Sequence, residues 1–169
     1  MTVDDSQDSP VAHMRLSVNG VHRDIEVPDD EALVTSLRKL GFTSVRAACG
    51  IGMCGTCTVQ VDGMVASSCL LLTRQVSGCE LVTSEGLVED GALSEVQQAF
   101  LDHRAYQCSF CIPGMVLTVD ACLRSHPSAT VSDVREYLSG NLCRCGTYPS
   151  ILEAVHALVA ARTAGGDVR

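Results

Sequence analysis

Four cysteines in the first half of the chain have a spacing suited to metal chemistry. They follow the pattern C-x4-C-x2-C, with the fourth after eleven further residues: Cys49, Cys54, Cys57 and Cys69. Thiolates at this spacing hold the two irons of a plant-type 2Fe–2S cluster. Gly50, Gly52 and Gly55 lack a Cβ, so the backbone between the ligands can adopt the positive φ angles that wrapping an inorganic core requires. The sequence therefore predicts a cluster held by these four cysteines, in a loop that the three glycines shape.

A second group of four cysteines lies in the other half of the chain. Its pattern is C-x2-C, then thirty-one residues, then C-x-C: Cys108, Cys111, Cys143 and Cys145. Each pair falls at the end of a predicted helix, and antiparallel helices bring such ends together. Helix N-termini also stabilise thiolates. We therefore expect these four sulfurs to converge at one pole of the helical half and to bind a second cluster.

The elements around the two groups differ in their periodicity. The first half alternates apolar and polar residues in two hairpins, whose turns are Asn19-Gly20 and Asp62-Gly63. A helix with leucines at 33, 37 and 40 separates the hairpins, and a late strand covers 80–83. The pattern becomes helical near residue 84 and predicts four helices. We expect an α+β protein: an N-terminal β-grasp, plant-type ferredoxin domain over residues 13–86, then a four-helix bundle over 87–162, with flexible tails at 1–12 and 163–169.

Composition excludes several classes of protein. A net charge of −8 and only 4% aromatic residues argue against a nucleic-acid partner. We expect no membrane span, because no apolar run approaches the roughly twenty residues that a span requires. The N-terminus has no signal-peptide pattern, so we expect a cytoplasmic protein with reduced cysteines.

Two structural alternatives account for the cysteines less completely. A disulfide framework needs an oxidising compartment. A zinc site built from Cys54, Cys57, Cys108 and Cys111 would leave the other four motif cysteines without a role. The two remaining cysteines, Cys79 and Cys122, are expected to be structural. No pattern for substrate chemistry is present, so we expect no catalytic residue on this chain.

The two cysteine motifs together resemble those of a known family. The segments C-G-I-G-M-C-G-T-C-T-V (49–59), Q-C-S-F-C-I-P-G-M (107–115) and G-N-L-C-R-C (140–145) resemble the small iron–sulfur subunit of the molybdenum hydroxylases. That family includes xanthine dehydrogenase, aldehyde oxidoreductase and carbon monoxide dehydrogenase, and the resemblance covers about residues 14–159. It implies that the first cluster faces a flavin or another acceptor and that the second lies beside molybdopterin. It also implies that Gln107 and Cys145 contact the molybdopterin.

The resemblance implies partners as well. They are a large molybdopterin-binding subunit and a medium FAD-binding subunit, or a cytochrome acceptor, assembled as a dimer of heterotrimers. One departure is visible, because the family commonly reads C-R-C-T-G-Y and this chain exchanges the two residues at Gly146 and Thr147. The exchange is similar to that in branches that oxidise N-heteroaromatics or aldehydes.

A free-standing two-cluster ferredoxin is the alternative to a subunit. Subunits carry exposed apolar surface that free carriers avoid. An exposed apolar face around Gln107, Pro113 and Met115 would therefore favour the subunit.

Overall fold

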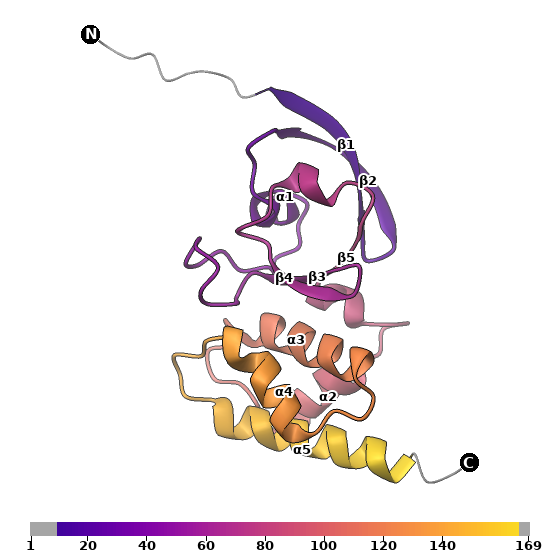
Figure 1. Cartoon of the computed structure of the whole chain (residues 1–169), viewed down its shortest axis with the longest axis vertical. Helices are drawn as coiled ribbons and strands as arrows, with labels where there is room; N and C mark the ends of the chain where they lie inside the picture. The colour runs from indigo at the N-terminus through magenta and orange to yellow at the C-terminus, as the bar shows by residue number, and fades with distance from the viewer. Residues whose placement is uncertain (1–9, 166–169) are drawn as a thin grey trace.

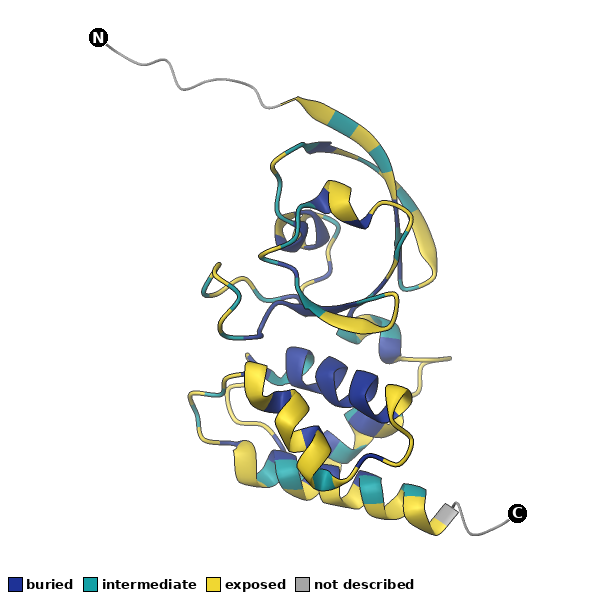
Figure 2. Cartoon of the chain, in the orientation of Figure 1, coloured by how far each residue is buried: buried dark blue, intermediate teal, exposed yellow. Residues whose placement is uncertain are grey.

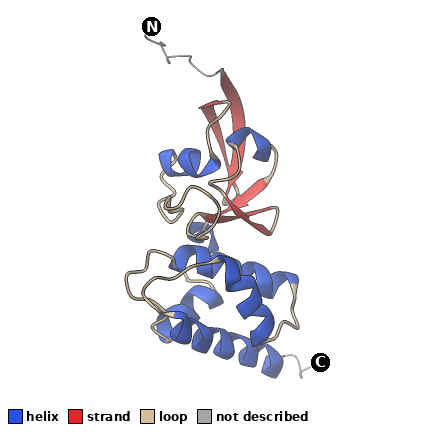
Figure 3. Cartoon of the chain, turned by 60° about the vertical axis from the view of Figure 1, so that its left-hand side comes forward, coloured by secondary structure: helices blue, strands red, loops and turns tan. Residues whose placement is uncertain are grey.

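A strand-rich half and a helical half lie one above the other in the computed structural model, which describes residues 10–165 (Figure 1). All strands belong to the first half, and the longer helices belong to the second (Figure 3). The described part is therefore α+β, as predicted. No helix within it is long and apolar enough to cross a membrane.

The strands form one five-stranded mixed sheet with the order β2-β1-β5-β3-β4. They are β1 (Val11–Val18), β2 (Val21–Pro28), β3 (Thr58–Val61), β4 (Met64–Ser67) and β5 (Glu80–Val82). β1 and β5 pair in parallel, whereas the hairpins β1–β2 and β3–β4 are antiparallel. Both predicted turns form, with positive φ at Asn19 and Gly20 (54° and 73°) and at Asp62 and Gly63 (49° and 82°). These are the conformations that a two-residue type I′ turn requires.

Helix α1 (Leu33–Lys39) packs on the sheet and closes the first core. Leu33 and Leu37 of the predicted stripe are fully buried, together with Leu16 and Val18 of β1. Two short 3₁₀ helices follow in this part of the chain, η1 (Thr73–Val76) and η2 (Ser84–Leu87). The second lies where the sequence pattern changes from strand to helix.

The second half contains α2 (Glu95–Asp102), α3 (Ile112–Ser125), α4 (Val131–Tyr137), the 3₁₀ helix η3 (Leu138–Gly140) and α5 (Tyr148–Gly165). α2 packs against α3 and α5, and α4 packs against the same two helices. Regular structure begins at Val11 and continues to Gly165, so it extends into the ranges expected to be tails. The remaining residues of those ranges, 1–9 and 166–169, lie outside the described part.

Helix α3 lies between the sheet and the other helices. Every residue from Gly114 to Leu123 is buried, because β3 contacts one side of the helix and α2 and α4 contact others (Figure 2). Met115 is 0% exposed, so it is not part of an exposed apolar face that could discriminate a subunit from a free ferredoxin. Its side chain lies in the core of the helical half, and the exposed apolar side chains nearby in the chain are Tyr106 and Phe110.

The contact between the halves is partly polar. The Gln60 side chain of β3 donates from Nε2 to the Leu117 carbonyl oxygen (3.1 Å) and to Asp120 Oδ2 (2.8 Å), both on α3. Gln60 and Asp120 are both buried. Buried polar groups are costly unless they are paired, so these hydrogen bonds fix how the sheet sits on α3.

Candidate metal centre

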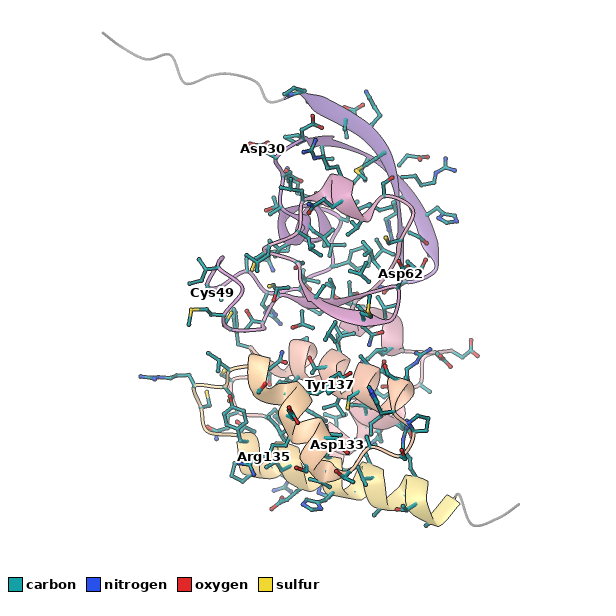
Figure 4. The ribbon with its side chains drawn as sticks, in the orientation of Figure 1. Asp30, Cys49, Asp62, Asp133, Arg135 and Tyr137 are labelled. Carbon is teal, nitrogen blue, oxygen red and sulfur yellow. The ribbon has the colours of Figure 1, made fainter. Side chains whose placement is uncertain are left out.

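The first cysteine group occupies the long loop between α1 and β3, and Cys49 lies on its outer part (Figure 4). Gly50, Gly52 and Gly55 have φ angles of 68°, 73° and 67°, in the region where a side chain would be strained. Two of them also lack space for a Cβ. A Cβ on Gly52 would lie 2.4 Å from Leu70 Cδ1, and one on Gly55 would lie 2.5 Å from the Gly140 carbonyl oxygen.

The loop directs backbone N–H groups at its sulfurs. The N–H groups of Ile51 and Cys54 donate to Cys49 and lower the pKa of its thiol to about 6. Burial, together with the neighbouring Cys57 thiol, raises the pKa of Cys69 to about 11. The sulfurs interact in two pairs, Cys49 with Cys54 and Cys57 with Cys69.

The second cysteine group is assembled from two loops of the helical half. Cys108 precedes α3 and Cys111 is its N-cap residue, whereas Cys143 and Cys145 lie in the turn between η3 and α5. Their sulfurs also interact in pairs, Cys108 with Cys145 and Cys111 with Cys143. Each pair thus joins one cysteine of the C-x2-C motif to one of the C-x-C motif.

The pKa values of the Cys111 and Cys143 thiols are shifted in opposite directions. Burial, together with the Cys143 thiol, raises the pKa of Cys111 to about 12. Burial acts in the same direction on Cys143, but the N–H and hydroxyl of Thr147 and the N–H of Cys145 outweigh it and lower the pKa to about 7. The thiolate is therefore favoured at Cys143, which receives several hydrogen-bond donors.

The donor set fits two 2Fe–2S clusters better than the alternatives. All ten cysteines are free thiols, so no disulfide framework is present. Within residues 10–165, no three His, Cys, Asp or Glu side chains converge on a single ion. The zinc alternative would separate Cys54 from Cys49 and Cys57 from Cys69, although the sulfurs of each of these pairs interact in the structure. Two pairs of thiols per group suit a cluster in which four thiolates hold two irons.

The two cysteine loops touch each other. The N–H of Leu142 donates to the carbonyl oxygen of Cys54 at 2.9 Å. A cavity of about 590 Å³ lies beside this contact, and its lining includes Cys54 of the first group and all four cysteines of the second. In Figure 1 both loops lie on the left-hand side of the molecule, one above the other.

Three residues beside the second group were not predicted from the sequence as part of the site. The Tyr148 hydroxyl donates to the Asn141 carbonyl oxygen and accepts from the Cys143 N–H, both at 2.9 Å, and so braces the turn. The Asn141 side chain and Thr147 are buried in the same turn. Their position next to the C-x-C motif is the signal that could have identified them.

The structure also gives the positions of the other residues that the sequence analysis named. Gln107 is exposed immediately before Cys108. Cys122 is fully buried in the helical core, and Cys79 is half-buried at the edge of the first core beside Asp62. Gly146 has a φ of 76°, which explains why glycine suits the position directly after Cys145.

Comparisons with known proteins agree with this geometry. Residues 16–80 match the family described as 2Fe-2S iron-sulfur cluster binding domain, and residues 83–156 match the 2Fe-2S binding domain. The chain is 43% identical over 141 residues to the nicotine 6-hydroxylase small subunit of Paenarthrobacter nicotinovorans, covering 83% of this chain and 85% of that one. It is 40% identical over 147 residues to the nicotinate dehydrogenase small FeS subunit of Eubacterium barkeri, covering 86% and 94%.

A solved structure extends the similarity to the whole fold. The chain resembles quinoline 2-oxidoreductase from Pseudomonas putida 86 with a TM-score of 0.85 and 37% identity, over 93% of this chain and 99% of the matched chain. The fold and cysteine groups define a two-cluster iron–sulfur protein. The chain belongs to the family of small iron–sulfur subunits of the molybdenum hydroxylases.

Proposed function

We propose that this chain transfers electrons within a molybdenum-dependent oxidoreductase, between a molybdopterin centre on a partner subunit and a flavin or another acceptor. Two residue sets would hold the two 2Fe–2S clusters. The first is Cys49, Cys54, Cys57 and Cys69, in the loop shaped by Gly50, Gly52 and Gly55, and the second is Cys108, Cys111, Cys143 and Cys145. When bound, each cluster accepts and releases one electron at a time. The chain's own residues position the sulfurs and direct N–H donors at them.

The contact between the two loops is the observation that carries this proposal. The hydrogen bond from the Leu142 N–H to the Cys54 carbonyl oxygen joins one cysteine of the first group to the residue before Cys143. A path through that hydrogen bond crosses no solvent gap. This arrangement suits two centres that act in series.

The division of the cysteines into two groups also suggests how the chain is divided into domains. We propose that residues 13–86 form one cluster-binding unit and residues 87–162 form the other, with α2–α5 as a four-helix bundle. The polar contact of Gln60 with Asp120 holds the two units together, because both side chains are buried and paired.

The partners we propose are a large molybdopterin-binding subunit and a medium FAD-binding subunit or a cytochrome acceptor, in a cytoplasmic dimer of heterotrimers. Gln107 and Cys145 would contact the molybdopterin. Exposed apolar side chains at Tyr106, Phe110 and Leu142 surround that part of the second loop, which favours a docked subunit over a free-standing ferredoxin. Because the relatives named above act on nicotine, nicotinate and quinoline, we propose an N-heteroaromatic substrate for the whole complex.

Metal analysis of the protein purified from its native source tests this function. We expect about four irons per chain, together with molybdenum and co-purifying larger chains. Iron without molybdenum and without partner chains would favour the free-standing ferredoxin. Zinc in place of iron would contradict both.

A further inference from the structure

Gly114 lies in the first turn of α3, at a position where the backbone conformation does not require a glycine. The glycines of the first cysteine loop have positive φ angles, whereas Gly114 does not. Within a helix, glycine is less favourable than alanine because it loses more conformational freedom on folding. Glycine at this position therefore needs another physical reason, and the space around it supplies one.

The first cysteine loop occupies the place where a side chain of residue 114 would lie. A Cβ on Gly114 would be 2.4 Å from the carbonyl oxygen of Gly55, the residue that follows Cys54. Close carbon–oxygen contacts between backbones are about 3.3–3.6 Å, so an alanine would push one backbone from the other by about 1 Å. Because Gly114 has no side chain, the loop rests directly on the start of α3.

Hydrogen bonds hold both sides of this contact in place. The Gly55 carbonyl oxygen accepts from the Thr58 hydroxyl at 2.7 Å, from the Thr58 N–H at 3.3 Å and from the Asn141 side chain at 3.0 Å. The Gly114 carbonyl oxygen accepts from the Thr118 hydroxyl at 2.9 Å. An added Cβ would therefore meet a fixed backbone atom, which cannot move aside as the end of a flexible side chain can.

The contact joins the two cysteine groups. Gly55 is bonded to Cys54 of the first group, and Gly114 follows closely after Cys111, the N-cap residue of α3 and a member of the second group. Both glycines are buried, so the contact excludes solvent. It lies beside the hydrogen bond from the Leu142 N–H to the Cys54 carbonyl oxygen, which joins the same two groups through the other loop.

We propose that Gly114 is a positioning residue for electron transfer between the two cysteine groups, because its lack of a Cβ keeps the first loop in contact with α3. The inference rests on the proposed function, in which each group binds a 2Fe–2S cluster. The step moves one electron: the group that gives it is oxidised, the group that receives it is reduced, and no bond forms or breaks. Electronic coupling weakens as a gap widens, so a side chain at this position should slow the transfer.

The test compares the iron-loaded full-length wild type with Gly114→Ala. A radiolytic pulse that reduces less than one cluster per molecule starts the reaction, and absorbance follows the electron as it redistributes between the clusters. We expect the rate of redistribution to fall severalfold in Gly114→Ala. We also expect the magnetic interaction between the two reduced clusters, seen in their electron paramagnetic resonance signals, to weaken. Iron content should stay at the wild-type value of about four per chain.

Two control variants separate this role from a general loss of stability. Gly140→Ala adds the same Cβ close to the contact, but at a place where it meets nothing within 4 Å, so the rate should not change. Cys122→Ala weakens packing in the same helix, because Cys122 is 0% exposed in the core of the helical half. It should lower the urea midpoint and leave the rate of redistribution unchanged.

A second variant keeps the inference testable if Gly114→Ala fails to retain both clusters. Thr58→Val removes the hydroxyl that donates to the Gly55 carbonyl and adds no bulk at the contact. The carbonyl then has more freedom to leave its place on Gly114. We expect a slower redistribution of the electron and a weaker magnetic interaction in Thr58→Val, with iron content unchanged.

The outcomes separate this inference from the proposed function. A Gly114→Ala chain with both clusters and the wild-type rate would overturn the inference and leave the proposed function intact. An equal fall in rate in Gly140→Ala or Cys122→Ala would also overturn it, because the close contact would not be the cause. Loss of a cluster in both Gly114→Ala and Thr58→Val would assign the contact to cluster assembly and overturn its role in electron transfer. A wild-type chain without two clusters would overturn the proposed function and this inference with it.

Discussion

The side chain of Asn141 donates from Nδ2 to the Gly55 carbonyl oxygen at 3.0 Å, and so ties the turn of the second cysteine group to the loop of the first. The same amide nitrogen lies 3.3 Å from Thr58 Oγ1, and Asn141 Oδ1 accepts from the Thr118 hydroxyl at 3.0 Å. Asn141 is only 4% exposed. One buried amide therefore contacts the first loop, β3 and α3, and fixes the position of one cysteine group relative to the other.

Replacing this amide should loosen the contact between the halves. In Asn141→Ala, the Gly55 carbonyl and the Thr118 hydroxyl lose a buried partner, and we expect a loss of about 2–4 kcal/mol in unfolding free energy. Urea denaturation measures that loss. We also expect a weaker magnetic interaction between the two reduced clusters in the iron-loaded chain.

Gln98→Ala is the control, because it removes an exposed amide that donates to Asp102 on α2. Its effect should stay within about 0.5 kcal/mol. An Asn141→Ala chain as stable as the Gln98→Ala chain would show that Asn141 does not hold the halves together.

Two glycines of the first loop should respond differently to alanine. Both have positive φ, so each substitution carries a strain of about 1–2 kcal/mol. Gly50 has open space around its Cβ position, whereas a Cβ on Gly55 would lie 2.5 Å from the Gly140 carbonyl oxygen. We expect Gly55→Ala to lose a further 1–3 kcal/mol or so from overpacking and to bind iron poorly. Thermal midpoints and iron content measure the difference, and equal effects of the two substitutions would contradict the close contact between the loops.

Substituting one cysteine should remove one cluster and spare the other. Cys145→Ser eliminates a sulfur that interacts with Cys108, so we expect about half of the iron to be lost and electron flow through the chain to stop. Cys122→Ala is the matched control, because Cys122 is buried outside both groups and should cost only about 1–2 kcal/mol of packing. The measurement is the iron content of the two variants, compared with that of the wild type. The ligand assignment is wrong if Cys122→Ala loses a cluster or if Cys145→Ser keeps both.

Glu85 should make stability depend on pH. Burial opposes its ionisation, but donation from the hydroxyls of Ser44 and Thr83 and from the Ser44 N–H outweighs burial and lowers the pKa of the carboxyl. A lowered folded-state pKa stabilises the fold above the unfolded-state value of about 4.3 and loses that contribution as the pH falls through the folded-state value.

The measurement is the urea midpoint of wild type and Glu85→Gln between about pH 3 and pH 7. We expect the wild type to be more stable at neutral pH, by no more than about 1 kcal/mol because the carboxylate is partly exposed to solvent. The difference should shrink as the pH falls below about 4. Glu153→Gln on the exposed side of α5 is the control, and a difference for Glu85→Gln that does not vary with pH would contradict the account.

The sequence predicts the features that depend on neighbouring residues. The spacing of Cys49 to Cys69 and the Asn19-Gly20 turn are both local, and the structure contains the turn as expected. The place of each cysteine pair at the end of a predicted helix also led us to expect that Cys108 and Cys111 would meet Cys143 and Cys145, and their sulfurs interact in the structure.

The features that the sequence did not predict depend on how the halves pack. Asn141 and Gly55 are 86 positions apart, and no pattern along the chain relates them. The complete burial of Met115 follows from the packing of α3 on several sides, which is not visible in the sequence of that helix.

The central claim is that this chain holds two separate 2Fe–2S clusters, and the most direct measurement is iron content combined with electron paramagnetic resonance of the reduced full-length chain. The account predicts about four irons per chain and two distinguishable signals, of which Cys145→Ser removes one. About two irons and a single signal, or a single signal that survives in Cys145→Ser unchanged, would contradict it.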